Sequence, residues 1–408
     1  MKIAIIGAGF TGLSAAYYIS QEKHKVYVFE KDQNPGGLAV GYLEKNWEWT
    51  LEKHYHHWFT NDNSILSLAR KIDHKIIIKR PKTSVYVDSE IYQFDSPLHL
   101  LQFPKLKIYD RLRMAAILGS LKYNPFWQPL ESIKTNEFLQ NAMGKNAYQT
   151  IWEPQLHNKF GDYADDISLA WFWARINKRT AQLAYPSGGF LTFANALVKK
   201  IEENGGKFLF NTEIREIKQL KNFDKIIVTL PSFYFVKIAP QLPNVYKQNL
   251  LQLKGLGAIN LILRLKKPFL PDNTYWLSIC DKESPIMAIV EHTNFMDSKH
   301  YNNEHIVYLG NYVPHDHPYM KLSANELLKI YDPYLRKINP NYTLDAINYT
   351  LFKAPFAQPI IPTYYSKIIP TLETPLKNVF LANMQQVYPW DRGTNYAVEL
   401  GEKIAQII

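Results

Sequence analysis

The feature of the sequence that most constrains the fold is a glycine loop directly after a short apolar run. Lys2–Ile6 is β-branched and apolar, and Leu13–Ser20 has helical spacing with alanines on one side. The G-x-G-x-x-G loop lies between them. Gly7 permits a tight turn, Gly9 lets a pyrophosphate approach the backbone, and Gly12 lets the helix pack closely on the strand. The pattern predicts a β-α-β unit whose helix N-terminus faces phosphates.

An acidic residue completes this fingerprint. Lys25–Phe29 reads as a second strand, and Glu30 follows it, 18 residues after Gly12. A carboxylate at this position accepts hydrogen bonds from ribose hydroxyls and repels a 2′-phosphate. With strand, helix and acid in register, the sequence predicts dinucleotide binding and disfavours NADP. The alternative is a glycine-rich turn in another α/β protein.

A second glycine pair follows the acid. Residues 30–37 have the form E-x5-G-G, ending in Gly36 and Gly37. Here the chain resembles the flavoprotein family that includes amine oxidases, protoporphyrinogen oxidases, phytoene desaturases and UDP-galactopyranose mutases. The resemblance implies FAD, and the position of Cys280 outside any closing motif favours non-covalent binding. Many members have Arg after the pair, whereas this chain has Leu38.

Further segments carry the same resemblance. His54–Asp62 is similar to the stretch beside the flavin and is most like the mutase version, which implies that His57 lies near the flavin. Pro186–Gly189, Val228–Pro231 and Asn378–Ala397 resemble other motifs of the family, and Asn383 stands where Asp or Glu is usual. The cofactor-binding residues implied are Gly7, Gly9, Phe10, Thr11, Gly12, Glu30, Lys31, Gly36, Gly37, Leu38, His57, Ile214, Asn383, Arg392, Gly393, Thr394 and Asn395.

The nucleotide-type elements occur in three separated blocks. We therefore expect an α/β fold: a Rossmann-like, glutathione-reductase-like FAD-binding domain with an interleaved α+β substrate domain. The FAD-binding domain is expected over 1–75, 186–231 and 346–408, and the substrate-binding region over 76–185 and 232–345. Within the second block, Ile214–Leu220 reads as a strand, and the resemblance implies that Ile214 falls on the strand whose backbone meets adenine.

Charge and composition limit the partners. The chain of 408 residues has 47 Lys and Arg against 37 Asp and Glu, a net charge of +10, which favours anionic partners. We expect a small-molecule substrate that can be anionic, no nucleic acid, and peripheral membrane contact as an open option. No signal peptide and no run of about 20 apolar residues is evident, so a cytoplasmic protein is the expectation. The oligomeric state is not specified.

Three groups of residues could carry chemistry. His54, His56 and His57 lack the i, i+4 spacing and the acidic or cysteine partners of a metal site, so no metal is expected. Lys159 could hold a water or an anion, and Arg175 or Arg179 could bind a carboxylate or phosphate. Arg392, beside the closing helix, is a further anion candidate. His57, Lys159 and Arg392 are the weak catalytic candidates, with structural packing or ion pairing as the alternative.

The resemblance implies an FAD-dependent oxidoreductase of the amine oxidase and protoporphyrinogen oxidase type. In such an enzyme the flavin accepts a hydride from a C–N or C–C bond. Two alternatives stay open at this point: a flavin-dependent sugar-nucleotide mutase, and a non-catalytic flavoprotein.

Overall fold

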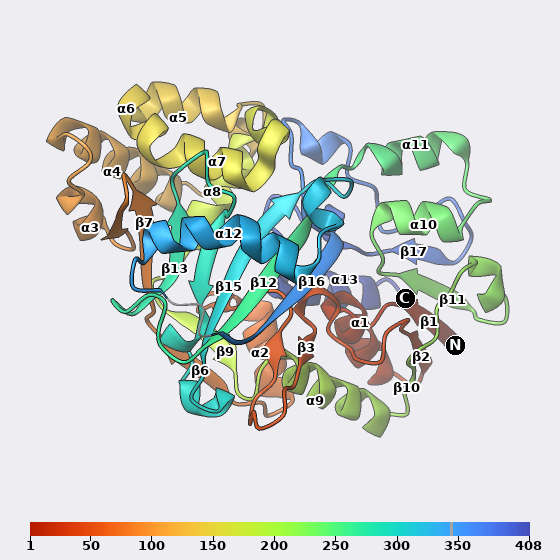
Figure 1. The fold of residues 1–408 in the computed structure, drawn as a ribbon. Coiled ribbons are helices and arrows are strands. Elements are labelled where there is room, and N and C mark those ends of the chain that lie inside the picture. The colour runs from red at the N-terminus through yellow and green to blue at the C-terminus, as the bar shows by residue number, and fades with distance from the viewer. Residues whose placement is uncertain (343–345) are drawn as a thin grey trace.

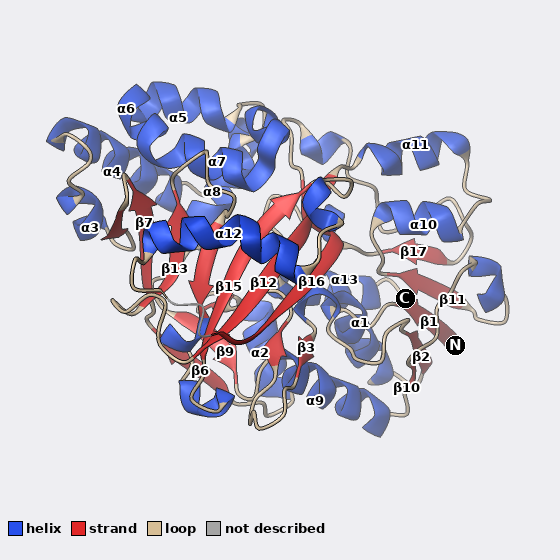
Figure 2. Ribbon diagram, viewed as in Figure 1, coloured by secondary structure: helices blue, strands red, loops and turns tan. Residues whose placement is uncertain are grey.

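The computed structural model describes residues 1–342 and 346–408. One layer is a five-stranded parallel sheet with the strand order β10-β2-β1-β11-β17 (Figures 1 and 2). Its strands are β1 (Lys2–Ile6), β2 (Lys25–Phe29), β10 (Lys207–Leu209), β11 (Lys225–Val228) and β17 (Val379–Leu381). The helices that accompany it are α1 (Phe10–Ser20), α2 (Asn63–Lys71), α9 (Phe190–Glu203), α10 (Ser232–Ile238), α11 (Asn244–Gln252) and α13 (Thr394–Ala405).

Alternation along the strands explains why helices cover both faces of this sheet. In β1, Ile3 and Ile5 belong to the hydrophobic cluster that holds residues of α1, α9 and α13. Ala4 and Ile6 point the other way and join a cluster that contains Phe235 of α10. Successive strand side chains point to opposite faces, and a parallel sheet is usually buried on both.

The second large sheet has seven strands in the order β16-β12-β15-β14-β13-β7-β8. These are β7 (Lys82–Val87), β8 (Glu90–Gln93), β12 (Gly255–Leu265), β13 (Thr274–Ile279), β14 (Ala288–Glu291), β15 (His305–Val313) and β16 (Ala346–Pro359). All neighbours are antiparallel except β13 and β7. Helix α12 (Ala324–Ile338) lies across one face (Figure 2), where Leu261 and Leu263 pack with Leu327 and Leu335. Ile262 points to the other face and joins the first cluster.

Two small sheets and a helical layer complete the molecule. The small sheets pair β5 (Trp58–Phe59) and β6 (Ile76–Lys79) with β9 (Leu183–Pro186), and β3 (Gly41–Tyr42) with β4 (Leu51–Glu52). The helical layer comprises α3 (Pro97–Gln102), α4 (Ile108–Tyr123), α5 (Thr135–Met143), α6 (Lys145–Ala147), α7 (Glu153–Phe160) and α8 (Leu169–Lys178). It lies above the seven-stranded sheet, with α3 and α4 at its outer edge (Figure 1).

The predicted strand Ile214–Leu220 is wrong. This segment contains a 3₁₀ helix over Ile217–Leu220, begun by a capping box in which the Gln219 side chain accepts from the Glu216 backbone N–H. Ile214, Ile217 and Leu220 are buried at intervals of three residues. That period is the three-residue turn of a 3₁₀ helix and not the two-residue alternation of a strand.

The predicted α/β fold class, with a Rossmann-like parallel sheet and an interleaved α+β part, is confirmed. The domain ranges stay a prediction. Within the range 346–408, β16 is hydrogen-bonded to β12 in the seven-stranded sheet, whereas β17 belongs to the parallel sheet. The expected boundary at 345 lies outside the described residues. Over the part of the chain that is described, no helix combines the length and apolar character needed to cross a membrane.

Candidate functional site

The glycine loop has the geometry that a dinucleotide phosphate requires. Gly7 has φ +104°, and a Cβ there would lie 2.6 Å from Thr229 Oγ1. A Cβ on Gly12 would lie 2.0 Å from the carbonyl oxygen of Gly7. Gly9 differs, because its Cβ would meet only Gly37 Cα, at 3.7 Å. Close packing therefore explains why positions 7 and 12 are glycine. At position 9 the protein leaves room for a side chain, so this space is open to a ligand.

The N-terminus of α1 is open to an anion. Gly9 is its N-cap residue, and among the described residues no side chain caps the helix and no acid occupies its first turn. The first intrahelical bond runs from Leu13 N–H to Gly9 O at 2.9 Å. The N–H groups of Phe10, Thr11 and Gly12 carry the partial positive charge of the helix end, which favours a phosphate.

Glu30 joins the glycine loop to the second strand. Its carboxylate accepts from Ala8 N–H at 2.8 Å and from Asp32 N–H at 3.0 Å. Gly36 N–H in turn donates to Ala8 O at 2.8 Å, which brings the second glycine pair against the first. Each carboxylate oxygen accepts more than one hydrogen bond, so Glu30 can serve both the loop and a ribose.

The other predicted cofactor residues near this junction, Lys31, Leu38 and Ile214, differ in their exposure. Lys31 is exposed at the rim. Leu38 packs against an apolar cluster of Ala258, Ala354 and Ala357, which explains an apolar residue where a basic one is common. Ile214 is buried near the junction, since Thr212 N–H donates to Glu30 O at 2.8 Å.

The three histidines of the predicted flavin stretch have separate partners. His54 Nδ1 accepts from Asn260 Nδ2 at 2.6 Å, and His56 Nδ1 donates to the backbone oxygen of His54 at 2.6 Å. His57 Nδ1 is hydrogen-bonded to the Tyr275 hydroxyl at 3.1 Å. In the described part of the chain no group of three His, Cys, Asp or Glu could hold a metal ion.

Burial keeps these imidazoles neutral. It lowers the pKa of His54 and His57 to about 3 and that of His56 to about 4, with nearby positive charge as the smaller cause. Neutral imidazoles present one donor and one acceptor each, which suits hydrogen bonding to a flavin ring or a carbonyl.

A buried carboxylate anchors the same segment. Glu52 accepts from the Tyr185 hydroxyl at 2.8 Å and from Phe190 N–H at 2.8 Å, and the Tyr308 hydroxyl donates to the Glu52 carbonyl at 2.6 Å. Burial raises the pKa of Glu52 to about 7 against the lowering effect of its hydrogen bonds. This anchor fixes the backbone two residues before His54.

The buried His292 makes the free energy of unfolding depend on pH. Burial lowers the pKa of His292 to about 3, below its unfolded value of 6.5, so the unfolded chain binds more protons between these values. Lowering the pH from 7 to 5 should therefore remove roughly 2 kcal/mol of stability through this one residue. Glu52 acts in the opposite direction, because its raised pKa adds stability as the pH falls. Urea unfolding of His292→Gln should show a correspondingly smaller loss between pH 7 and 5.

The exposed His315 supplies the control. His315→Gln should retain the full loss of stability on acidification. An unchanged pH dependence in His292→Gln would contradict the assignment of a neutral buried imidazole.

The closing segment brings the start of α13 to the same region. Gly393 is the N-cap residue of α13, with no side-chain cap among the described residues. Thr394 Oγ1 accepts from Trp58 Nε1 at 2.7 Å, and Asn395 Oδ1 accepts from Ser64 and Ile65 N–H at 3.0 and 3.1 Å. The two polar side chains thus connect α13 to Trp58 of β5 and to α2. Neither of them caps the N-terminus of α13, which stays open to a ligand.

Asn383 is fully engaged within the protein. Its Oδ1 accepts from Gln385 N–H at 3.0 Å, and its Nδ2 donates to Leu230 O at 3.0 Å and Ser232 Oγ at 3.2 Å. The side chain is buried and caps the turn Met384–Gln386. Its predicted contact with a cofactor stays a prediction, and its structural role explains an amide here.

Arg392 belongs to a charge cluster, formed with Asp391, Arg175 and Lys159, whose members come from separate segments of the sequence. Asp391 accepts from Arg175 Nη1 at 2.9 Å and from Trp171 Nε1 at 3.0 Å. The Arg392 guanidinium donates to Gln358 Oε1 at 3.0 Å and to the Tyr312 hydroxyl. The ion pair with Asp391 is therefore made by Arg175, whereas the Arg392 guanidinium is hydrogen-bonded to neutral partners.

Lys159 adds a third cation to this cluster. Its ammonium lies 4.6 Å from the centre of the Tyr312 ring and also faces the rings of Phe160 and Trp171. Burial, with the charge of Arg175, holds its pKa well below the usual range. Burial would raise the pKa of Asp391, but the three cations outweigh that effect and lower it to about 2. Asp391 is therefore an ionised carboxylate that is paired with Arg175 and lies near Arg392 and Lys159. Arg179 is exposed, and its charge is the second cause of the lowered pKa of His57.

Several residues of the region were missed in the sequence. They are Tyr55, in the loop between β4 and β5, and three polar or phenolic side chains inside long strands: Asn260, Tyr312 and Gln358. Asn260 lies in β12 and Gln358 in β16, both buried. A polar residue inside an apolar run needs a partner, and that signal could have identified these two positions.

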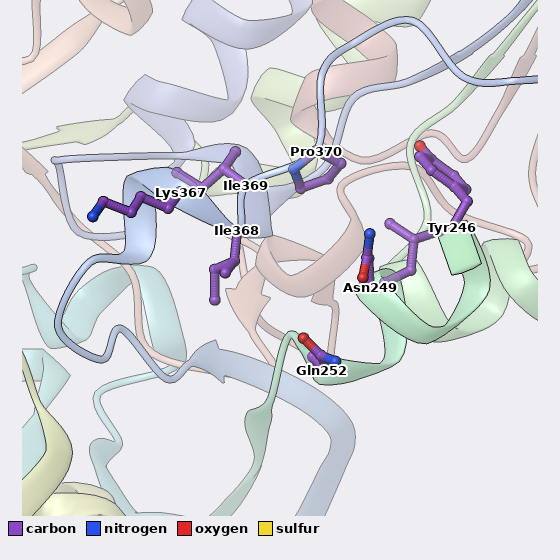
Figure 3. A pocket seen from close by; sticks show the side chains of 8 residues that line it. Tyr246, Asn249, Gln252, Lys367, Ile368, Ile369 and Pro370 are labelled. Atoms are coloured by element: carbon purple, nitrogen blue, oxygen red, sulfur yellow. The ribbon is translucent and has the colours of Figure 1, made fainter. Parts of the chain in front are cut away.

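One hollow lies away from the predicted residues. It has a volume of about 210 Å³ and lies between α11, with Tyr246, Asn249 and Gln252, and the segment Lys367–Pro370 (Figure 3). None of the predicted cofactor or catalytic residues lines it, so we place the candidate site at the glycine loop and the charge cluster.

The residues at the glycine loop fit a dinucleotide. The uncapped N-terminus of α1, the free space over Gly9 and the Glu30 carboxylate lie at one edge of the parallel sheet. This is the carboxyl edge of the strands, where open α/β sheets bind ligands.

Known proteins agree with this fold. Residues 10–408 match the family described as flavin containing amine oxidoreductase. A zeta-carotene desaturase of Capsicum annuum is 26% identical over 250 residues, which are 53% of this chain and 42% of the desaturase. The match thus covers about two fifths of that relative's length.

Solved structures share the architecture over the whole chain. An oxidoreductase from Methanosarcina mazei superposes with a TM-score of 0.76 at 18% identity, covering 100% of both chains. A reduced UDP-galactopyranose mutase gives a TM-score of 0.75 at 15% identity, covering 100% of this chain and 97% of the mutase. Likeness at these identities establishes the fold, and the family match extends over nearly all of the sequence. The chain belongs to the flavin containing amine oxidoreductase family.

Proposed function

We propose that this protein binds FAD non-covalently and is an FAD-dependent oxidoreductase of the amine oxidase and protoporphyrinogen oxidase type. The observation that carries the proposal is the uncapped N-terminus of α1 beside the open face of Gly9 and the carboxylate of Glu30. These groups suit a pyrophosphate and a ribose. Cys280 is buried, and burial raises its pKa to about 12, so it offers no reactive thiolate for a covalent link.

The chain's own residues would orient the reactants. A bound flavin supplies the hydride acceptor for oxidation of a C–N or C–C bond. The N-terminus of α13 favours negative charge close to it, and the neutral His57 is held by Tyr275. The lowered pKa of Lys159 increases the fraction of free amine, so Nζ can accept a proton.

We further propose that the substrate carries an anionic group. Arg175 and Arg392 place two positive charges near one carboxylate, and Lys159 would add a third when it is protonated. A carboxylate or phosphate beside Lys159 and Arg392 would balance them with charge-assisted hydrogen bonds. It would also raise the pKa of Lys159 towards its ordinary value.

Lys159→Met tests the anion site directly. We expect the FAD-loaded variant to bind malonate or inorganic pyrophosphate at least about tenfold more weakly than wild type, the cost of one charged hydrogen bond. Calorimetric titration measures the affinity, and the flavin already occupies the glycine loop in both proteins. The matched control is Lys178→Met, whose ammonium lies over Trp390 and not in the charge cluster. Equal affinity in Lys159→Met and wild type would contradict the assignment.

Oxidoreductase activity is tested on the bound flavin. The flavin should be reduced by light under anaerobic conditions and reoxidised by oxygen or a quinone. A flavin that undergoes neither change would favour a non-catalytic flavoprotein.

A sugar-nucleotide mutase is the second candidate. The cluster of two arginines and a lysine favours it, because such a cluster suits a diphosphate. An anaerobic assay with reduced flavin and UDP-galactopyranose separates the two candidates. Turnover without an electron acceptor would support the mutase, and its absence would favour the oxidoreductase.

A further inference from the structure

Helix α4 exposes an apolar stripe to solvent. Ile108, Leu112, Ala116, Gly119 and Tyr123 follow one another at intervals of three or four residues, and all lie on one side of the helix. Ile108 is 60% exposed, Leu112 55% and Tyr123 85%. A Cβ on Gly119 would meet no atom within 4 Å.

The stripe is not the packed face of the helix. The opposite side of α4 carries Met114 and Leu121, which are buried in the core of the helical layer with Leu139 and Trp173. Helix α4 is therefore apolar on two sides, and only one of them has a partner among the described residues.

Neighbouring residues widen this surface. Leu98 of α3, Tyr109 and Phe126 are also largely exposed. Of the fifteen large hydrophobic side chains that are exposed in the described chain, six lie within residues 98–126. Single exposed hydrophobics are ordinary, whereas a contiguous group of this kind marks an interaction surface.

The charge around the stripe is positive. Residues 97–127 contain five basic residues against one acid, Asp110, a net charge of +4. The five are Lys105, Lys107, Arg111, Arg113 and Lys122. Lys105 pairs with Asp88 and Glu90, whereas Arg111, Arg113 and Lys122 donate to neutral backbone carbonyls. With Asp88 and Glu90 included, the net charge of this region is +2.

An aromatic hollow opens at the end of the stripe. It has a volume of about 640 Å³ and is lined by Tyr123, Trp127, Trp173 and Trp390, among others. Tyr123 belongs to both features. Trp390 stacks on Trp173 with ring centres 5.1 Å apart and immediately precedes Asp391 of the charge cluster.

We infer that the α3–α4 surface docks on an anionic phospholipid bilayer. The apolar stripe enters the boundary between headgroups and acyl chains, and the net positive charge around it attracts the lipid phosphates. Figure 1 places α3 and α4 at the outer edge of the molecule, where a flat surface can reach them. In the docked state the mouth of the aromatic hollow lies against the lipid, which gives apolar molecules a route to the region of Trp390.

Vesicle co-sedimentation tests the inference independently of flavin and activity. The FAD-loaded protein should bind vesicles of phosphatidylcholine with 30% phosphatidylglycerol, and bind pure phosphatidylcholine vesicles at least about tenfold more weakly. Ile108→Asp with Leu112→Asp should reduce binding to the mixed vesicles at least about tenfold, because each aspartate removes buried apolar area. Lys107→Ala should reduce it about fivefold, the contribution of one cation at the surface.

The matched control carries the same change on another helix. Val245 and Leu251 of α11 are 70% and 54% exposed, so Val245→Asp with Leu251→Asp adds the same charge at comparable positions. This variant should bind vesicles like wild type. Equal loss in both double variants, or no binding by wild type, would overturn the inference. A different result would favour a second copy of this chain as the partner. In that case the wild-type protein is a dimer that does not bind vesicles, and Ile108→Asp with Leu112→Asp dissociates the dimer.

Discussion

Replacing Gly9 by valine should abolish FAD binding and leave the apoprotein folded. Gly9 has φ −71° and ψ 172°, which any residue adopts. Its Cβ would meet only Gly37 Cα at 3.7 Å, so the chain itself tolerates a side chain. The valine methyl groups would instead occupy the space in front of the α1 N-terminus. We expect the affinity for FAD to fall by at least about a hundredfold, since the pyrophosphate loses its approach to the backbone.

Fluorescence titration of the apoprotein with FAD measures this loss, and urea unfolding of the apoprotein measures the fold. The expected result is wild-type unfolding with weak or undetectable FAD binding. A Gly9→Val protein that retains FAD with wild-type affinity would refute the assignment of the loop to the pyrophosphate.

Replacing Gly12 by alanine should damage the fold itself. A Cβ at this position would lie 2.0 Å from Gly7 O and 3.4 Å from Ile5 Cγ2. Helix α1 must move away from β1 to relieve the contact, and it then loses its packing on the parallel sheet. Overpacking of this kind costs about 3 kcal/mol or more.

Urea unfolding of the apoprotein measures this cost without any cofactor. Gly119→Ala is the matched control, because Gly119 is also helical but a Cβ there meets no atom within 4 Å. That substitution should be neutral or stabilise by up to about 1 kcal/mol. A Gly12→Ala protein as stable as wild type would contradict the close packing of α1 on β1.

The sequence predicted best those parts whose signals are local. The glycine loop and the acid after β2 depend on short-range rules of turn geometry and periodicity, and the structure has them at these positions. The strand predicted over Ile214–Leu220 is wrong because the apolar residues 214, 217 and 220 recur every third position, the period of a 3₁₀ turn. The side-chain hydrogen bonds of Gln219 decide in favour of the turn.

Long-range pairing could not be predicted in the same way. Strand β13 pairs parallel with β7, nearly two hundred residues earlier in the chain, and neither sequence specifies its partner. The ion pair between Arg175 and Asp391 joins residues 216 positions apart. Arg175 and Arg392 were recognised as anion candidates separately, but only the fold shows that they lie near one carboxylate together with Lys159.

The departures from the family pattern also have physical explanations in the fold. Leu38 is half-buried against the alanine cluster that includes Ala258 and Ala354, a contact that favours an apolar side chain. Asn383 donates from Nδ2 to Leu230 O and Ser232 Oγ, a task that a carboxylate, without a donor, could not perform.

The visible absorption spectrum of the purified protein, with the released cofactor identified after heat denaturation, tests the central proposal most directly. We expect a yellow protein with a flavin spectrum that releases intact FAD into the supernatant. A colourless protein that takes up no FAD on incubation would contradict the proposal and leave the glycine loop without its predicted ligand.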